Sequence, residues 1–128
     1  MIEIVTDPFP SDEAMRALWR VAWGGDGPHS FQPILARSLG HVGALAGGQL
    51  VGFVNVAWDG GVHAFILDTC VDPAHRRGGI ASRLVERAAA LARQRGAHWL
   101  HVDFEPHLEG FYRQCGVVPT AAGVMRLV

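Results

Sequence analysis

The sequence predicts a single α/β domain, a mixed and mostly antiparallel sheet flanked by helices, and two observations lead to this fold class. Three apolar runs at residues 42–46, 50–57 and 62–71 are separated only by short glycine-rich breaks, which is the pattern of an antiparallel meander. A long amphipathic segment at 79–95 follows, and a further apolar run at 99–104 comes after it. A strand–helix–strand step of this kind adds a parallel pair to the sheet.

The elements before the meander are a short strand and two helices. Residues 2–5 alternate in polarity as a strand does, and residues 7–10 contain two prolines and form a turn. Ser11 is placed to cap a helix that ends near Gly24-Gly25, and a weaker helix is expected over 31–39. The apolar face of the first helix would hold four residues: Ala14, Leu18, Val21 and Ala22.

The segments after the meander follow a helical period and then a hairpin pattern. Apolar residues recur in 79–95 with the spacing of a helix, and Gly96 ends it. Its core-facing residues would be Ile80, Leu84, Val85, Ala88, Leu91 and Ala92. A short helix is expected at 108–115, and residues 117–119 and 124–128 are expected to close as a final hairpin.

Length and composition favour one packed domain over residues 1–128. Hydrophobic residues make up 49% of the chain, which is enough for a core. No apolar run approaches the roughly 18 residues of a membrane span, and the start of the chain lacks the pattern of a signal peptide. Cys70 and Cys115 do not resemble a disulfide framework. We therefore expect a cytoplasmic protein with reduced thiols and no membrane partner.

The net charge of −1 hides an uneven distribution. There is no lysine, and residues 75–95 carry six arginines against one acid, Glu86. A nucleic-acid-binding domain would be basic overall, so we expect no nucleic-acid partner; one local basic segment suits a compact polyanion such as a nucleotide cofactor. Arg76 and Arg77 precede the helix, where no helical face requires them. For three arginines further on, a solvated helix face is the alternative: Arg83, Arg87 and Arg93.

Residues 76–81, Arg-Arg-Gly-Gly-Ile-Ala, lie between the apolar run 62–71 and the long helix. Pro73 ends the strand, the glycines allow a close approach of the backbone, and the helix N-terminus presents unpaired N–H groups between two arginines. These features favour a phosphate, and a pyrophosphate above all. Neither a GxxxxGK[ST] loop nor a GxGxxG fingerprint is present.

Two strands carry acidic residues at unexpected positions. Residues 99–105 alternate so that one face holds His101, Asp103 and Glu105, which indicates a wet cleft; an exposed sheet face or an interface is the alternative. Asp68 interrupts the apolar run of the preceding strand. An unpaired buried carboxylate is costly, so Asp68 must either pair with an arginine or face the site.

The seven histidines do not indicate a metal site. His98 and His101 are three residues apart, which in a strand points them to opposite faces, and no cysteine or histidine spacing fits zinc. We therefore expect no metal.

The segment 76–81 fits the pattern [Q/R]-x-x-G-x-[G/A] and resembles the pyrophosphate loop of the GNAT acetyltransferases, which bind acetyl-coenzyme A (acetyl-CoA). Its setting is similar too: the strand end 69–73 precedes it, and residues 111–117 look like the family's FYxxxGF element with Val117 in place of Phe. The resemblance covers residues 42–128 well and the preceding ones loosely. It implies a GNAT-type sheet in which two central strands splay apart.

The resemblance also implies a cofactor site. Backbone N–H groups of the loop, with two arginines, would hold the pyrophosphate. The backbone of Cys70 and Val71 would bond the pantetheine arm between the splayed strands, and an amide near Val71 would polarise the thioester carbonyl. The residues concerned are Cys70, Val71, Arg76, Arg77, Gly78, Gly79, Ile80, Ala81, Ser82 and Tyr112.

Four residues are candidates for proton transfer. Tyr112 matches the residue that in many family members protonates the departing thiolate, and a phenol of pKa about 10 is protonated at neutral pH. Packing in the core is the alternative for this side chain. Glu105 stands where the family commonly has asparagine and could receive the proton of the amine, with Asp68 and Asp103 as further candidates.

The function expected from this resemblance is N-acetyl transfer from acetyl-CoA to a primary amine of a small molecule or protein, by direct attack in a ternary complex. Asn55, Trp58, Asp59 and His101 would line the acceptor pocket, although an ordinary turn explains Trp58 and Asp59 equally well. The acidic remainder of the chain favours a cationic acceptor. A homodimer is a further implication. The alternative is a non-catalytic module that binds CoA or acyl-CoA as a sensor.

Overall fold

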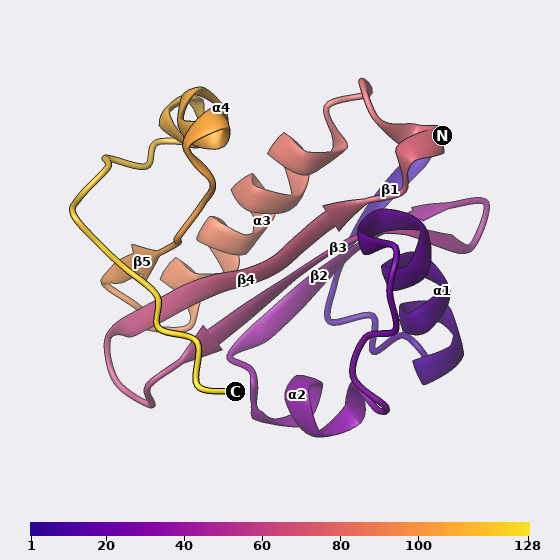
Figure 1. Ribbon diagram of the computed structural model, residues 1–128, viewed down its shortest axis with the longest axis horizontal. Coiled ribbons are helices and arrows are strands. Elements are labelled where there is room, and N and C mark those ends of the chain that lie inside the picture. Colours follow the sequence, from indigo (N-terminus) through magenta and orange to yellow (C-terminus); the bar gives the residue numbers. More distant parts are fainter.

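One five-stranded sheet organises the computed structural model, which describes residues 1–128 (Figure 1). Its strands lie in chain order: β1 (Ile2–Thr6), β2 (Gly40–Ala46), β3 (Gln49–Trp58), β4 (His63–Val71) and β5 (Trp99–His101). The helices are α1 (Asp12–Trp23), α2 (Gln32–Arg37), α3 (Ile80–Gln94) and α4 (Glu109–Gln114), with 3₁₀ turns η1 (Pro73–His75) and η2 (Pro106–Leu108). The predicted mixed α/β fold is confirmed.

The only parallel pair of strands, β4 and β5, is short, and the two strands separate beyond it. β1 to β4 pair antiparallel, whereas β4 and β5 run parallel and are connected through α3. Their pairing covers only His63–Phe65 against Trp99–His101. Beyond Phe65 this edge of β4 has no neighbouring strand, so its backbone groups remain available to another partner. This is the separation of strands that the family resemblance implies.

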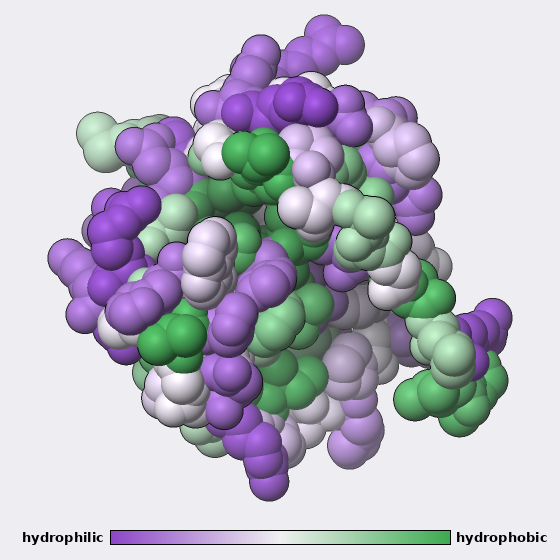
Figure 2. Space-filling model, turned by 90° about the vertical axis from the view of Figure 1, so that its left-hand side faces the viewer, coloured by the Kyte–Doolittle hydropathy of each residue, from purple (hydrophilic) through white to green (hydrophobic).

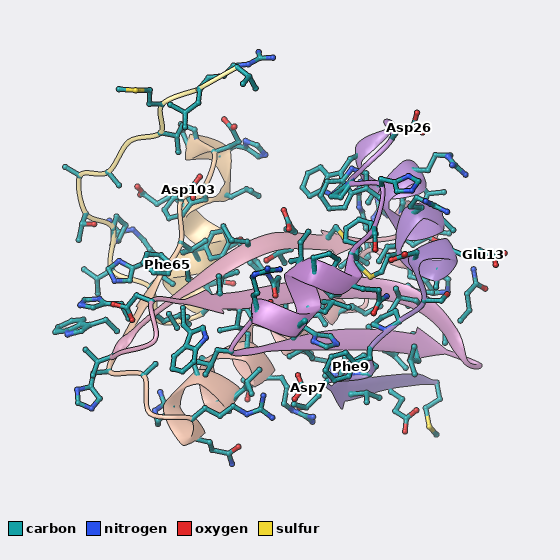
Figure 3. The ribbon with its side chains drawn as sticks, turned by 90° about the horizontal axis from the view of Figure 1, so that it is seen from below. Asp7, Phe9, Glu13, Asp26, Phe65 and Asp103 are labelled. Carbon is teal, nitrogen blue, oxygen red and sulfur yellow. The ribbon has the colours of Figure 1, made fainter.

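Helices cover both faces of the sheet. α3 packs on one face, and all six of its predicted core residues are buried. α1 packs on the other face through Met15 and Leu18, which contact Phe53 of β3 and Cys70 of β4 in a second cluster. Figure 3 shows α1 and α3 on opposite sides of the sheet. None of the helices combines the length and the hydrophobicity that a membrane crossing requires.

The ends of α1 follow the predicted signals, but its apolar face is narrower than expected. Ser11 caps the helix, its Oγ accepting a hydrogen bond from the Ala14 N–H at 3.1 Å, and Gly24 ends it in the left-handed conformation at φ 83°. Val21, expected in the core, is 52% exposed. Ala22 of the same turn packs against the second cluster, so Val21 alone of the four predicted residues lies outside the packed face.

Two arginines of α3 stabilise the edge of the sheet. Arg83 donates a hydrogen bond to the Ile2 carbonyl, and Arg87 donates to the Ile4 carbonyl and to Thr6, each at 3.3 Å. They therefore occupy backbone acceptors on the open edge of β1, which would otherwise be exposed to another strand. This gives Arg83 and Arg87 a structural role away from the cofactor loop.

Two expectations for the C-terminal part are wrong. The predicted strand 99–104 keeps strand geometry only at Trp99–His101, and no hairpin forms, since residues 117–128 contain no helix or strand. The chain leaves the sheet after His101 to reach η2 and α4, and this leaves β5 with an edge too short to hold a hairpin. Pro119 also lacks the N–H that a central strand requires.

Candidate active site

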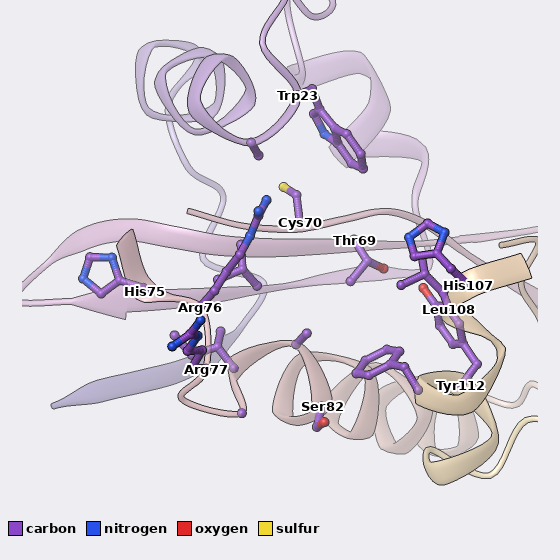
Figure 4. Close-up of a pocket in the computed structure, with 16 residues that line it drawn as sticks. Trp23, Thr69, Cys70, His75, Arg76, Arg77, Ser82, His107, Leu108 and Tyr112 are labelled. Carbon is purple, nitrogen blue, oxygen red and sulfur yellow. The ribbon is translucent and has the colours of Figure 1, made fainter. Parts of the chain in front are cut away.

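A cleft of about 570 Å³ opens where β4 and β5 separate (Figure 4). The end of β4, the loop before α3, the first turn of α3, η2 and α4 form its walls, and the end of α1 closes it from above. Seen from the side of β5 and α4, hydrophobic groups lie in a recess bordered by hydrophilic ones (Figure 2). The cleft exists because β5 stops pairing after three residues.

The predicted phosphate loop forms one end of this cleft. Gly79 takes the N-cap position of α3 at φ 72°, with no side chain capping the helix, so the first N–H groups of α3 remain free for a ligand. Arg76 and Arg77 line the same region and are exposed. Of the ten residues predicted to bind the cofactor, all but Gly78 line the cleft.

A β-bulge in β4 shapes the wall next to the loop. Phe53 of β3 pairs with Cys70, but Asn55 pairs with Leu67, so one residue of β3 faces Asp68 and Thr69 together. Asp68 has a positive φ of 60°, a conformation that aspartate tolerates better than most residues. The extra residue resets the alternation of side chains, and Thr69, Cys70 and Val71 all line the cleft.

Asp68 is the carboxylate at the bulge beside this wall, and it is not among the residues that line the cleft. It is partly buried and forms no salt bridge, so the pairing with an arginine allowed by the sequence does not occur. Burial raises the pKa of Asp68. Burial also raises the pKa of the Cys70 thiol to about 12, and the charge of Asp68 adds to this. Cys70 is therefore a thiol rather than a nucleophilic thiolate at neutral pH.

Tyr112 lies at the other end of the cleft and is 6% exposed. Its ring stacks on Phe104 and meets Phe111 edge-on, both with centroids 4.9 Å away, so it belongs to the core and to the cleft at once. Burial raises the pKa of its phenol; the Thr69 hydroxyl opposes this, and the charges of Cys115 and Asp103 add to it. The phenol is a proton donor throughout the neutral range.

Thr69 faces Tyr112 across the cleft (Figure 4). The Thr69 hydroxyl is buried and forms no hydrogen bond with any protein group. This includes the Tyr112 hydroxyl, although Thr69 is close enough to affect the pKa of Tyr112. An unpaired buried hydroxyl is unfavourable, so this atom is available to a ligand.

The other predicted site residues lie outside the cleft wall. Asp103 and Glu105 are exposed, although Asp103 is near enough to Tyr112 to affect its pKa. Asn55 is 3% exposed and is hydrogen-bonded to Ser38, which follows α2. Asp59 accepts a hydrogen bond from the Gly61 N–H at 2.7 Å, as the turn alternative supposes. Trp58 pairs with Ala64 on the α3 side of the sheet, opposite to Asn55.

Sequence reasoning missed several lining residues. Ala22 and Trp23 come from the last turn of α1, and His75, His107 and Leu108 come from the two 3₁₀ turns. The sequence around Trp23 gives no sign that this residue lines a cleft. Its position over β4 depends on how α1 packs on the sheet. No group of three or more histidine, cysteine or carboxylate side chains converges on one point as a metal site would require.

The chain thus combines a mixed sheet that opens between β4 and β5 with an uncapped helix N-terminus and two arginines at the opening. The sequence matches the Acetyltransferase (GNAT) family over residues 1–117, and the chain belongs to that family.

Curated relatives match in part. Glucosamine 6-phosphate N-acetyltransferase 1 of Oryza sativa is 41% identical over 51 residues, which are 40% of this chain and 31% of the relative. The probable glucosamine 6-phosphate N-acetyltransferase 2 of the same plant is 34% identical over 59 residues, 46% of this chain and 36% of the relative. The chain thus spans about a third of the length of the curated relatives it matches.

Solved structures match over the whole chain. A GNAT-family acetyltransferase from Streptococcus pneumoniae superposes with a TM-score of 0.81 at 25% identity, covering 100% of this chain and 98% of that one. The glucosamine-6-phosphate N-acetyltransferase of Arabidopsis thaliana superposes with a TM-score of 0.80 at 14% identity, covering 98% and 97%. The latter likeness concerns the fold.

Proposed function

We propose that the chain is an N-acetyltransferase that moves acetyl from acetyl-CoA to a primary amine of a small molecule or protein by direct attack in a ternary complex. One observation carries this: the free N-terminus of α3 with its arginines and the protonated phenol of Tyr112 line the same cleft. Membership of the GNAT family and its acetyl-CoA-dependent chemistry support the proposal.

Acetyl-CoA would lie along the cleft, from the loop before α3 to Tyr112. Arg76, Arg77 and the first N–H groups of α3 would hold the pyrophosphate. The backbone edge of β4 at Cys70 and Val71, which β5 leaves unpaired, would bond the pantetheine arm as an added strand does. An N–H group near Val71 would polarise the thioester carbonyl. Bound there, acetyl-CoA supplies an activated acetyl group.

Two side chains would handle the protons. Tyr112 holds one at its hydroxyl oxygen for the thiolate that leaves as the C–S bond breaks. Asp68 receives the proton that the attacking amine loses as the C–N bond forms, and its partial burial beside Thr69 supports this choice. Asp103 and Glu105, exposed on the outer side, would pass the proton to water. The raised pKa of Cys70 supports direct transfer over an acyl-cysteine.

We further infer a cytoplasmic homodimer. Both cysteines are free thiols, which supports a reducing compartment. The exposed apolar C-terminal segment supports association with a second copy.

The proposal is tested by acetyl-CoA binding and thiol release. Acetyl-CoA should raise the melting temperature, and a panel of primary amines should release free CoA thiol. Gly79→Ala places a side chain at φ 72°, where only backbone strain opposes it. It should abolish the shift by acetyl-CoA. Gly47→Ala is the matched control, because Gly47 has φ 56° in the turn between β2 and β3, does not line the cleft and has equally open space around it.

Gly47→Ala should destabilise the chain to a similar extent and keep the shift. A shift with no thiol release from any amine would favour the sensor module. An unaltered shift in Gly79→Ala would remove the loop from the cofactor site.

A further inference from the structure

Part of the sheet face that carries α1 and α2 is uncovered. Phe65 and Leu67 of β4 are 37% and 41% exposed, whereas Ala64 and Ile66, which alternate with them, are buried under α3. Large apolar side chains in the interior of a sheet are normally covered, so this exposure sets the patch apart from the rest of β4.

His101 of β5 completes the patch. Its ring stacks on Phe65 with centroids 4.7 Å apart and planes inclined by 21°. Its Nε2 lies 2.8 Å from Nδ1 of His63, which fixes the ring in place. Phe65, Leu67 and His101 therefore form a flat, partly aromatic surface, the β4–β5 platform. In Figure 3 Phe65 and Asp103 lie on the side of the sheet that carries α1.

The platform runs directly into the proposed catalytic cleft. Asp68 follows Leu67, and Thr69, the first residue of β4 that lines the cleft, comes next. Strand residues advance by about 3.3 Å each, so a small molecule can contact Leu67 and reach the cleft. The charges at this end are negative: Asp68 at the end of the platform and Asp103 beyond His101. The chain has no lysine, and Arg76 and Arg77 line the cofactor cleft.

We infer that the platform binds the non-reacting part of the acceptor, and that this acceptor is a primary amine carried on an aromatic or branched alkyl group without a phosphate. The inference rests on the proposed function and names its substrate class. The apolar body would lie on Phe65 and Leu67 with its ammonium directed to Asp68. A phosphorylated amino sugar, named in the curated relatives, would instead bring its phosphate toward Asp68 and Asp103.

The test compares two amines that differ in their apolar body. The double variant Phe65→Ser/Leu67→Ser should raise KM for phenethylamine about tenfold or more, the loss expected when apolar contacts of this size are removed. KM for ethylamine and for acetyl-CoA should stay unchanged, and glucosamine 6-phosphate should be a poor acceptor. Leu67→Ser alone, at an exposed site, should show a smaller effect in the same direction. Val62→Ser, at a 39% exposed position outside the platform, is the control and should match the parent.

Binding measured without turnover separates this inference from the proposed function. With the chain saturated with CoA, phenethylamine should shift the His101 ring resonances in NMR and should fail to do so in the double variant. If that result is obtained and no amine releases thiol, the proposed function fails while the platform remains an amine-binding surface. An unchanged phenethylamine KM in the double variant, or faster acetylation of glucosamine 6-phosphate than of phenethylamine, would overturn the inference.

Discussion

Tyr112 is the residue whose proposed role is most sharply defined, because its ring and its hydroxyl have different tasks. The ring packs on Phe104 and Phe111, and the hydroxyl faces Thr69 in the cleft. Tyr112→Phe keeps the ring and its packing and removes only the hydroxyl, which is the proton donor. Turnover should fall by about 10²–10⁴-fold with acetyl-CoA affinity unchanged. Steady-state kinetics and acetyl-CoA titration check this, and a parent rate with chemistry rate-limiting would contradict it.

Asp68 should destabilise the folded chain when it is ionised, which is the state that its proposed role requires. Its pKa is raised by burial, so the folded chain binds this proton more readily than the unfolded chain. Ionisation above the ordinary pKa of aspartate therefore lowers stability. Asp68→Asn should raise the melting temperature at pH 7, with a gain that shrinks toward acid pH, while thiol release falls sharply. Thermal melts between pH 3.5 and 7 measure the gain.

Asp68 must be ionised to accept a proton, and burial raises its pKa. As the pH is lowered, the activity of the parent should therefore begin to fall at a higher pH than the ordinary pKa of aspartate would predict. Equal stability of Asp68→Asn and the parent at pH 7, or an active Asp68→Asn, would argue against this role. Asp26→Asn is the control, because Asp26 is an exposed carboxylate outside the cleft lining, and this variant should match the parent in thiol release.

At the scale of elements, a buried polar clamp joins β1, β2 and the end of α3. His41 of β2 is fully buried, and its Nε2 accepts a hydrogen bond from the Phe9 N–H at 2.9 Å. The ring proton therefore lies on Nδ1, which faces the Asp7 carboxylate at 3.4 Å. Asp7 also pairs with Arg95 at 2.7 Å. Protonation of His41 would break the bond from Phe9.

This clamp should make the chain sensitive to mild acid. Burial lowers the pKa of His41, with Asp7 opposing the effect. The unfolded chain thus takes up the proton more readily below about pH 6.5, so stability is present above that pH and declines as pH falls through it. His41→Gln, which can still accept from Phe9 and donate to Asp7, should flatten the decline in melting temperature between pH 7.5 and 5.5.

His98→Gln, at an exposed histidine, should leave the decline as in the parent. Identical slopes for His41→Gln and the parent would show that His41 does not titrate in this range.

Local sequence predicted those elements whose signals are local. The cap at Ser11, the meander and the core face of α3 follow from residue type and period, and so does the loop at 76–81. The short β5 could not be predicted, because Val102 and Phe104 remain apolar and pack on the core without pairing in the sheet. Thr69 enters the cleft only through the bulge at Asp68, which depends on pairing with β3.

At the scale of the whole molecule, the C-terminal segment 117–128 exposes apolar side chains that a monomer would leave in water. It leaves α4 and joins neither the sheet nor another helix, and it is drawn in yellow in Figure 1. Its large apolar side chains are 79% to 102% exposed: Val118, Val124, Met125, Leu127 and Val128. β5 also has no strand on its outer edge. Exposed apolar residues beside a free edge are a typical site of association between chains.

We expect the chain to be a dimer in which this segment contacts a second copy. Sedimentation should give the dimer mass, and the melting temperature should rise with protein concentration. Val124→Asp/Leu127→Asp should give a monomer, because two charges cannot be buried in an apolar interface without partners. Phe9→Ser, at a 57% exposed apolar position elsewhere, is the control and should leave the dimer intact. A monomer of the parent chain at high concentration would show that the segment remains exposed to solvent.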